Sequence, residues 1–151
     1  MTARTVSESI EIAAAPEDVF AVVSDLVQMG RFSLENLGGR WLDGVQGPQV
    51  GARFKGRNRQ GRSSWSTTAT VIECDAPSRF SFAVTYFGIK VSRWTYQLAP
   101  RDGGVTLTQS WSDERPGWFA VVTKPLVDDR HAFTQRSIHH TLTTMKAFLE
   151  A

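Results

Sequence analysis

The middle of the chain and its end follow two different hydrophobic periods. From about residue 53 to residue 112, apolar and polar residues alternate with a period of two, and turn residues separate the runs. Residues 127–149 instead carry apolar side chains at helical spacing. One amphipathic helix cannot bury its apolar stripe against its own turns, so the stripe must lie on the sheet. We therefore expect an α+β fold in which a curved antiparallel sheet wraps around a long C-terminal helix and leaves room between them.

The alternating region divides into short strands joined by turns such as Gln60-Gly61 and Asp102-Gly103-Gly104. A further alternating segment lies near the N-terminus. Short connections of this kind join antiparallel neighbours. We expect about seven strands, at residues 6–12, 37–42, 52–59, 63–74, 79–86, 91–98 and 105–111.

Two short helices are predicted after the first strand. Pro16 fits the first position of a helix, and two acidic residues follow it where they complement the helix dipole. Asp25, with Gln28 three residues later, resembles a capping box and predicts a second short helix that ends near Gly30. The apolar segment 116–125 has a proline at each end and is predicted to be a short helix or a flexible lid.

The length and composition favour one domain spanning residues 1–151. No apolar run approaches the roughly 20 residues of a membrane span, and the first residues lack the apolar core of a signal peptide. The single cysteine, Cys74, cannot form an internal disulfide. We expect a soluble, cytoplasmic protein without a membrane span.

Basic residues gather in one predicted strand, although the net charge is only +2. They alternate with other residues, so they share one face of the strand. Such a row is typical of a solvated outer face, and it is also a possible docking surface for an acidic partner such as an acyl carrier protein. Nucleic acid is not expected, because aromatic residues do not interleave with the charges. The row consists of Arg53, Lys55, Arg57 and Arg59.

The opposite faces of the predicted strands combine large aromatic residues with a few amides and hydroxyls, which is typical of ligand pockets. Simple core packing is the alternative explanation for any one of the aromatics. In the strand at 63–74 either face could point inward, and Trp65 favours its own face over that of Ser66, Thr68, Thr70 and Ile72. The candidate ligand-binding residues of the strands are Phe54, Asn58, Trp65, Thr67, Phe82, Tyr86, Trp94, Gln109 and Trp111.

The helical stripe changes character along its length. Its later positions, such as Ile138 and Leu142, are ordinary core, whereas its earlier positions are His131, Thr134 and Gln135. Buried polar groups without partners are costly, so this end of the stripe should border a cavity. His131 and Gln135 therefore join the candidate ligand-binding residues. In the alternative, the helix begins later or is rotated, and His131 lies in solvent.

Motifs of conventional catalysis are missing from the sequence. It has no G-x-S-x-G elbow, no H-E-x-x-H or Cys/His cluster, no Walker loop and no dinucleotide fingerprint. The adjacent His139 and His140 point to different sides of the predicted helix and cannot share one metal ion. We expect neither a metal nor an organic cofactor.

The predicted order of elements resembles the helix-grip fold of the START/Bet v 1-like superfamily (SRPBCC). Residues 35–73 contain the motifs Trp41-Leu42-Asp43-Gly44, Gly47-Pro48, Val50-Gly51-Ala52-Arg53-Phe54, Gly56-Arg57-Asn58-Arg59, Gly61 and Trp65-Ser66-Thr67-Thr68. With these motifs the sequence is similar to actinobacterial proteins of the polyketide cyclase/dehydrase type, and the resemblance as a whole extends from Val6 to Glu150. It implies a hydrophobic cavity between the sheet and the long helix, in a group that includes lipid and hormone carriers, aromatase/cyclases and stress-response proteins. It supplies no shared catalytic residues.

Three functions fit these observations. The first is binding of a small hydrophobic ligand (aromatic, polyketide-like or lipid-like) in the cavity. The second is an aromatase/cyclase acting on a poly-β-keto intermediate, in which His131 is the candidate general acid or base and Asn58 or Gln109 polarises a carbonyl. The third is a non-catalytic regulatory or interaction protein that uses the basic strand.

Overall fold

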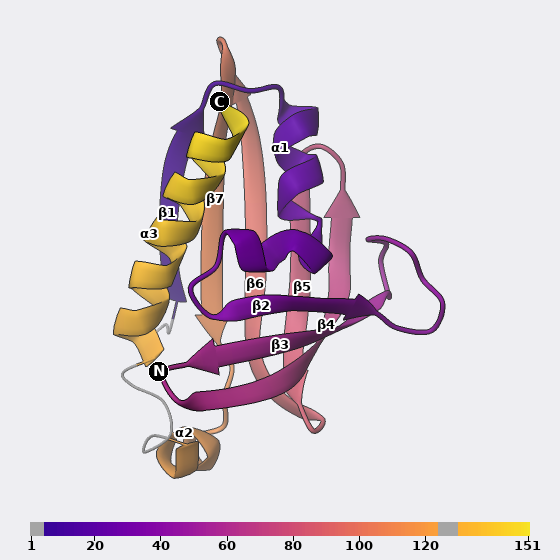
Figure 1. Ribbon diagram of the computed structural model, residues 1–151, viewed down its shortest axis with the longest axis vertical. Coiled ribbons are helices and arrows are strands. Elements are labelled where there is room, and N and C mark those ends of the chain that lie inside the picture. Colours follow the sequence, from indigo (N-terminus) through magenta and orange to yellow (C-terminus); the bar gives the residue numbers. More distant parts are fainter. Residues whose placement is uncertain (1–4, 124–129) are drawn as a thin grey trace.

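Seven antiparallel strands curve around the C-terminal helix in the computed structural model, which describes residues 5–123 and 130–151 (Figure 1). The helix-grip prediction is confirmed. In chain order the elements are β1 (Thr5–Ile12), α1 (Pro16–Val23), the 3₁₀ helix η1 (Leu26–Arg31), β2 (Asn36–Trp41), β3 (Arg53–Gln60), β4 (Ser63–Asp75), β5 (Arg79–Tyr86), β6 (Ile89–Arg101), β7 (Gly104–Asp113), α2 (Gly117–Thr123) and α3 (Arg130–Leu149).

The strand order explains how a cavity forms beneath the helix. The sheet runs β1-β7-β6-β5-β4-β3-β2, so the first strand pairs with the last and the hairpins follow in turn. Figure 1 shows β6 and β7 running along the long axis of the molecule, whereas β2 and β3 run across it. Because the sheet turns in this way, its concave face surrounds one end of α3 and η1 instead of lying flat against them.

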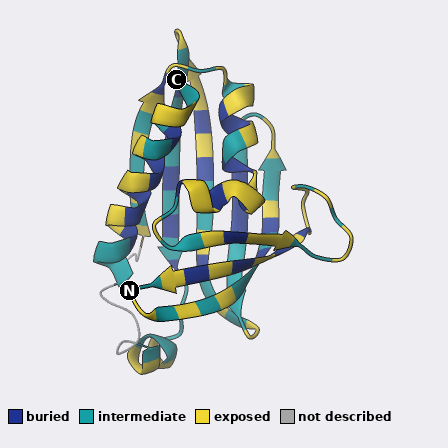
Figure 2. Cartoon of the chain, in the orientation of Figure 1, coloured by how far each residue is buried: buried dark blue, intermediate teal, exposed yellow. Residues whose placement is uncertain are grey.

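The face of α3 that meets the sheet is apolar toward the C-terminus and carries small hydroxyl residues toward the N-terminus. Leu142 and Met145 are fully buried, while the buried hydroxyl residues Thr134, Ser137 and Thr141 begin earlier on the helix and flank the buried Ile138. Figure 2 shows the buried residues gathered on the inner side of this helix and of the strands behind it. The core therefore fills the upper part of the concave face, and the polar part of the helix lies over the lower part.

One prediction about local structure is wrong, and another concerns residues that the structure does not describe. Asp25 precedes η1, but its side chain makes no capping hydrogen bond, so the predicted capping box is wrong. The short helix still forms, as a 3₁₀ helix that continues to Arg31 and is anchored by the buried Leu26 and Met29. The predicted start of the last helix at Val127 lies outside the described residues.

The strand β3 alternates strictly between its two faces. Phe54, Gly56 and Asn58 are buried, and the four basic residues between and beside them are exposed. The outward orientation predicted for Arg53, Lys55, Arg57 and Arg59 is therefore confirmed.

Candidate functional site

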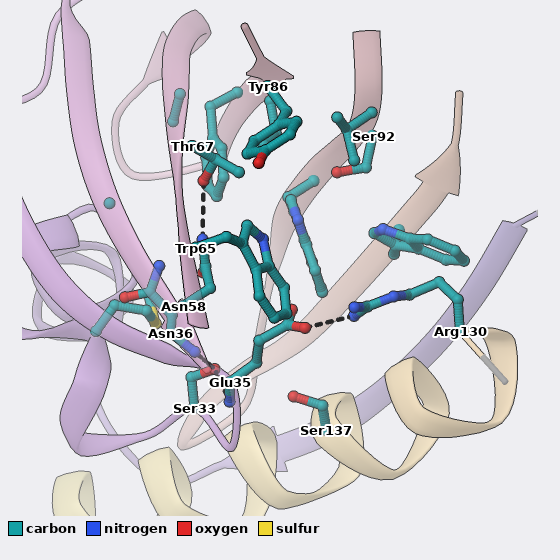
Figure 3. A pocket seen from close by; sticks show the side chains of 18 of the residues that line it. Ser33, Glu35, Asn36, Asn58, Trp65, Thr67, Tyr86, Ser92, Arg130 and Ser137 are labelled. Atoms are coloured by element: carbon teal, nitrogen blue, oxygen red, sulfur yellow. Dashed lines mark hydrogen bonds and ion pairs between the residues drawn. The ribbon is translucent and has the colours of Figure 1, made fainter. Parts of the chain in front are cut away.

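A cavity of about 260 Å³ lies between the concave face of the sheet and the N-terminal half of α3. Strands β2 to β7 form most of its wall, with η1 and α3 on one side and α2 at one end. Figure 3 shows several of the side chains that converge on it. All the strand residues predicted to bind a ligand line this cavity: Phe54, Asn58, Trp65, Thr67, Phe82, Tyr86, Trp94, Gln109 and Trp111.

The β3–β4 hairpin presents one amide and one hydroxyl to the cavity. Asn58 lies opposite Trp65 in the ladder, and its Nδ2 donates a hydrogen bond of 3.0 Å to Oγ1 of Thr67 (Figure 3). The faces of β4 are therefore settled in favour of Trp65, whereas Ser66 lies on the outer face and is exposed. This pair forms a polar spot in the wall, where the NH₂ group of Asn58 is already engaged by the Thr67 hydroxyl.

A second polar spot lies deeper, on β6 and β7. Gln109 and Tyr96 are directly opposite each other in the ladder, and both are buried. Nε2 of Gln109 donates to the Tyr96 hydroxyl at 3.1 Å, and that hydroxyl points to Sδ of Met29 at 3.9 Å. Burial raises the pKa of Tyr96 well above its usual value, so the phenol keeps its proton. Oε1 of Gln109 is buried and has no hydrogen-bond partner within residues 5–123 and 130–151.

Aromatic rings make up much of the remaining wall. Trp94 of β6 and Trp111 of β7 are cross-strand neighbours with ring centroids 6.4 Å apart. Phe82 lies opposite Trp94 on the other side of β6. Period-two alternation brings these rings to one face, because each is separated from the next inward position by one residue. The wall can therefore bury a large apolar surface.

An ion pair that sequence reasoning missed also lines the cavity. Nη1 of Arg130, in the first turn of α3, lies 2.7 Å from Oε2 of Glu35, just before β2, and Figure 3 shows the pair beside Trp65. Both side chains are largely buried, with exposed fractions of 12% for Arg130 and 15% for Glu35. Desolvation raises the pKa of Glu35, and the nearby Arg130 guanidinium opposes this rise without cancelling it.

The two helix residues predicted to border the cavity lie elsewhere. His131 is half-buried behind the wall: Nε2 lies 3.2 Å from Oδ2 of Asp113, and its ring meets Trp111 edge to face at 5.2 Å. Gln135 is exposed, in a shallow outer depression with Glu8 and His139. Neither is among the residues that line the cavity. The predicted stripe is buried at Thr134, Ile138 and Leu142, but the cavity lies on the flank of the helix that carries Ser137 and Thr141.

Asp113, the last residue of β7, has a completely buried carboxylate. Nε and Nη2 of Arg115 donate to its two oxygens at 2.9 Å and 2.8 Å, and His131 shares one of them. Arg115 lines the cavity, but this bidentate pairing already neutralises its charge. The cluster therefore fixes the end of β7 and the start of α3 together.

Across residues 5–123 and 130–151, no group of three or more His, Cys, Asp or Glu side chains could hold a metal ion. In the same ranges, no helix has the length and hydropathy needed to cross a membrane.

Comparison with known proteins identifies the group to which this architecture belongs. Residues 3–150 match the family described as polyketide cyclase / dehydrase and lipid transport, and no curated protein matches the chain. Among solved structures, a polyketide-cyclase-like protein from Corynebacterium glutamicum shares 31% identity at a TM-score of 0.69, with 99% of this chain and 93% of that chain covered.

Two more distant structures show the fold alone. A protein from Chromobacterium violaceum has 15% identity and a TM-score of 0.73, and 98% of each chain is covered. Ara h 8.0201 has 16% identity and a TM-score of 0.69, again with 98% of each chain covered. The fold is thus the Bet v 1-like helix-grip fold. Since the family match spans nearly the whole sequence, the chain belongs to the polyketide cyclase/dehydrase and lipid transport family.

Proposed function

We propose that the protein binds a small hydrophobic ligand (aromatic, polyketide-like or lipid-like) in the cavity beneath α3. The observation that carries this proposal is the composition of the wall: aromatic rings line much of a space of about 260 Å³, and hydroxyl groups, amides and paired charged side chains are set among them. This combination of apolar surface and isolated, fixed polar groups is how small-molecule sites are usually built. Burial of apolar surface supplies the binding energy.

The size of the cavity favours a compact ligand. At about 260 Å³ it is slightly smaller than the roughly 300–1,000 Å³ of most ligand pockets. Two fused rings suit such a space better than a long acyl chain, which would have to leave the cavity. Ring systems also suit the wall, because Trp94 and Trp111 can pack on an aromatic face or edge.

The test uses an apolar two-ring probe, 2-methylnaphthalene, titrated into the labelled protein while the indole N–H signals are followed by NMR. The signals of Trp65, Trp94 and Trp111 should shift together. Trp94→Ala should weaken binding roughly tenfold, since it removes much of one wall. Trp118→Ala is the matched control, because Trp118 is 61% exposed on α2 and does not line the cavity. No binding to the wild-type protein would refute the proposal.

The second candidate function is an aromatase/cyclase acting on a poly-β-keto intermediate. The observation that favours it is a titratable group in the cavity wall, which is Glu35 and not His131. A carboxyl whose pKa is raised by burial can exchange a proton nearer neutral pH. The amides of Asn58 and Gln109 would polarise substrate carbonyls.

A turnover assay on a poly-β-keto thioester separates this candidate from a carrier. For a cyclase, Glu35→Gln should lower kcat by roughly 10²–10⁴-fold with near-normal binding. A loss in His131→Ala without a loss in Glu35→Gln would return the acid/base role to the imidazole. A wild-type protein that binds the thioester and leaves it unchanged is a carrier.

We further propose that the basic row on β3 docks an acidic carrier protein. Its four side chains are exposed, and their partners across the β3–β4 ladder are all serine or threonine. Arg53 is already paired with Asp43, at 2.7 Å, which leaves the middle of the row to a partner. A regulatory or interaction protein would use the same surface. A cytoplasmic location stays a prediction.

Charge reversal tests this surface. In Arg57→Glu/Arg59→Glu, association with an acidic acyl carrier protein should slow and its dependence on salt should flatten. Lys90→Glu, an exposed change on β6, is the control. Unchanged kinetics in the double variant would leave a solvated outer face as the explanation of the row.

A further inference from the structure

Gln109 carries a buried side-chain amide in which the NH₂ group makes a hydrogen bond and the oxygen does not. It lies in the middle of β7 with 3% of its surface exposed, and it lines the cavity. Its Nε2 donates to the hydroxyl of Tyr96, whose own proton points to Sδ of Met29. This chain of donors fixes the orientation of the amide and turns Oε1 away from Tyr96. That oxygen is buried and has no partner among the described residues.

A buried acceptor without a partner lowers stability by roughly 1–3 kcal/mol. The inward neighbours of Gln109 along β7 are Leu107 and Trp111, and those of Tyr96 along β6 are Trp94 and Leu98. Leu98 and Leu107 have no donor to offer, and the indole N–H groups of Trp94 and Trp111 make no hydrogen bond with Oε1. Gln109 is one of the residues that line the cavity, so a ligand bound there is the source of a donor that the described residues do not supply.

We propose that the ligand of this cavity is a hydroxylated aromatic molecule whose hydroxyl group donates a hydrogen bond to Oε1 of Gln109. The proposal rests on the proposed ligand-binding function and narrows it to a chemical class. The ring packs against Trp94 and Trp111, and the hydroxyl pairs with an amide oxygen that is buried in the wall without a partner among the described residues.

Other polar ligands fit this cavity less well. A carboxylate offers only acceptors to Oε1 and needs a free cation, but the two arginines of the wall are already paired, Arg115 with Asp113 and Arg130 with Glu35. A ketone likewise offers only an acceptor. A purely apolar ligand would cover Oε1 and leave it without a partner.

The test compares 2-naphthol with 2-methylnaphthalene, which has nearly the same shape but no donor. In the wild-type protein, 2-naphthol should bind about tenfold more tightly. In Gln109→Leu this ratio should fall to about one, because the acceptor is gone. Asn58→Leu is the matched control: it removes another amide of the wall, one whose Nδ2 is used by Thr67, and it should keep the preference.

The outcomes separate this inference from the proposed function. If neither probe binds, the ligand-binding function itself fails. If both bind with equal affinity, or if Gln109→Leu keeps the preference, the cavity binds ligands but Gln109 does not select a hydroxyl. Should Gln109→Leu fail to fold, Gln109→Met repeats the test with an unbranched side chain, and the wild-type ratio alone still decides whether a hydroxyl is preferred.

Discussion

Replacing Arg130 with Met should destabilise the protein in a strongly pH-dependent way. The substitution keeps an unbranched apolar stem but leaves the Glu35 carboxylate in the cavity wall without its cation. In the wild-type protein, desolvation already raises the pKa of Glu35, and the charge and hydrogen bond of Arg130 oppose that rise. Removing them should raise the pKa further.

The sign of the effect follows from proton linkage. A carboxyl whose pKa is higher in the folded state binds its proton more tightly there, so its contribution to stability is present at low pH and is lost as the pH rises through the folded-state pKa. Toward pH 5 the variant loses a neutral hydrogen bond, about 1 kcal/mol. At pH 8 it should lose about 3 kcal/mol, the low end of the roughly 3–5 kcal/mol for breaking a buried pair, because both side chains face a cavity that water can enter.

Urea unfolding of the wild type, Arg130→Met and Glu35→Gln/Arg130→Met at several pH values between 5 and 8 provides the measurement. Other titrating groups are common to the two variants, so the difference between them isolates Glu35. Arg130→Met should lose stability with rising pH relative to the double variant. If the two variants show the same pH dependence, Glu35 does not depend on Arg130 for its ionised form.

Two further substitutions test the packing of the fold. Leu142→Ala, at a fully buried position of α3, should lower the free energy of unfolding by roughly 2–5 kcal/mol, whereas Val121→Ala on the exposed face of α2 should change it by less than about 0.5 kcal/mol. A loss below about 1 kcal/mol for Leu142→Ala in urea melts would contradict its core position. Gly104→Ala should also destabilise, by more than about 1 kcal/mol, because the added Cβ would meet the carbonyl oxygen of Ile12. Gly117→Ala should leave the free energy of unfolding unchanged in the same melts, because the space around its added Cβ is open.

The strands of the cavity could be predicted from the sequence because the period of two fixes which side chains share a face. Once Phe54 or Trp111 is placed inward, Asn58 and Gln109 follow from their spacing alone. The fold followed from the same pattern, since one amphipathic helix has only the sheet to pack on. Trp65 identified the inner face of β4 correctly for the same reason: a large ring prefers the buried side.

The helix and the loops were harder to predict. The predicted stripe is buried at Thr134, Ile138 and Leu142, but the cavity lies on the flank of the helix that carries Ser137 and Thr141, and the apolar pattern does not distinguish the two flanks of a stripe. The spacing of Ser137 and Thr141, four residues apart beside Ile138 and Leu142, was the available signal. Glu35 precedes a strand, and no local pattern links it to an arginine 95 positions later, so only the tertiary structure reveals the pair.

The central claim is that an aromatic ligand lies inside the cavity beneath α3, and nuclear Overhauser effects between bound 2-naphthol and the labelled protein test it most directly. The account predicts contacts from the naphthol ring to the indole protons of Trp94 and Trp111 and to the ring of Phe54. Contacts confined to exposed side chains, such as Trp118 and Val121 on α2, would contradict it.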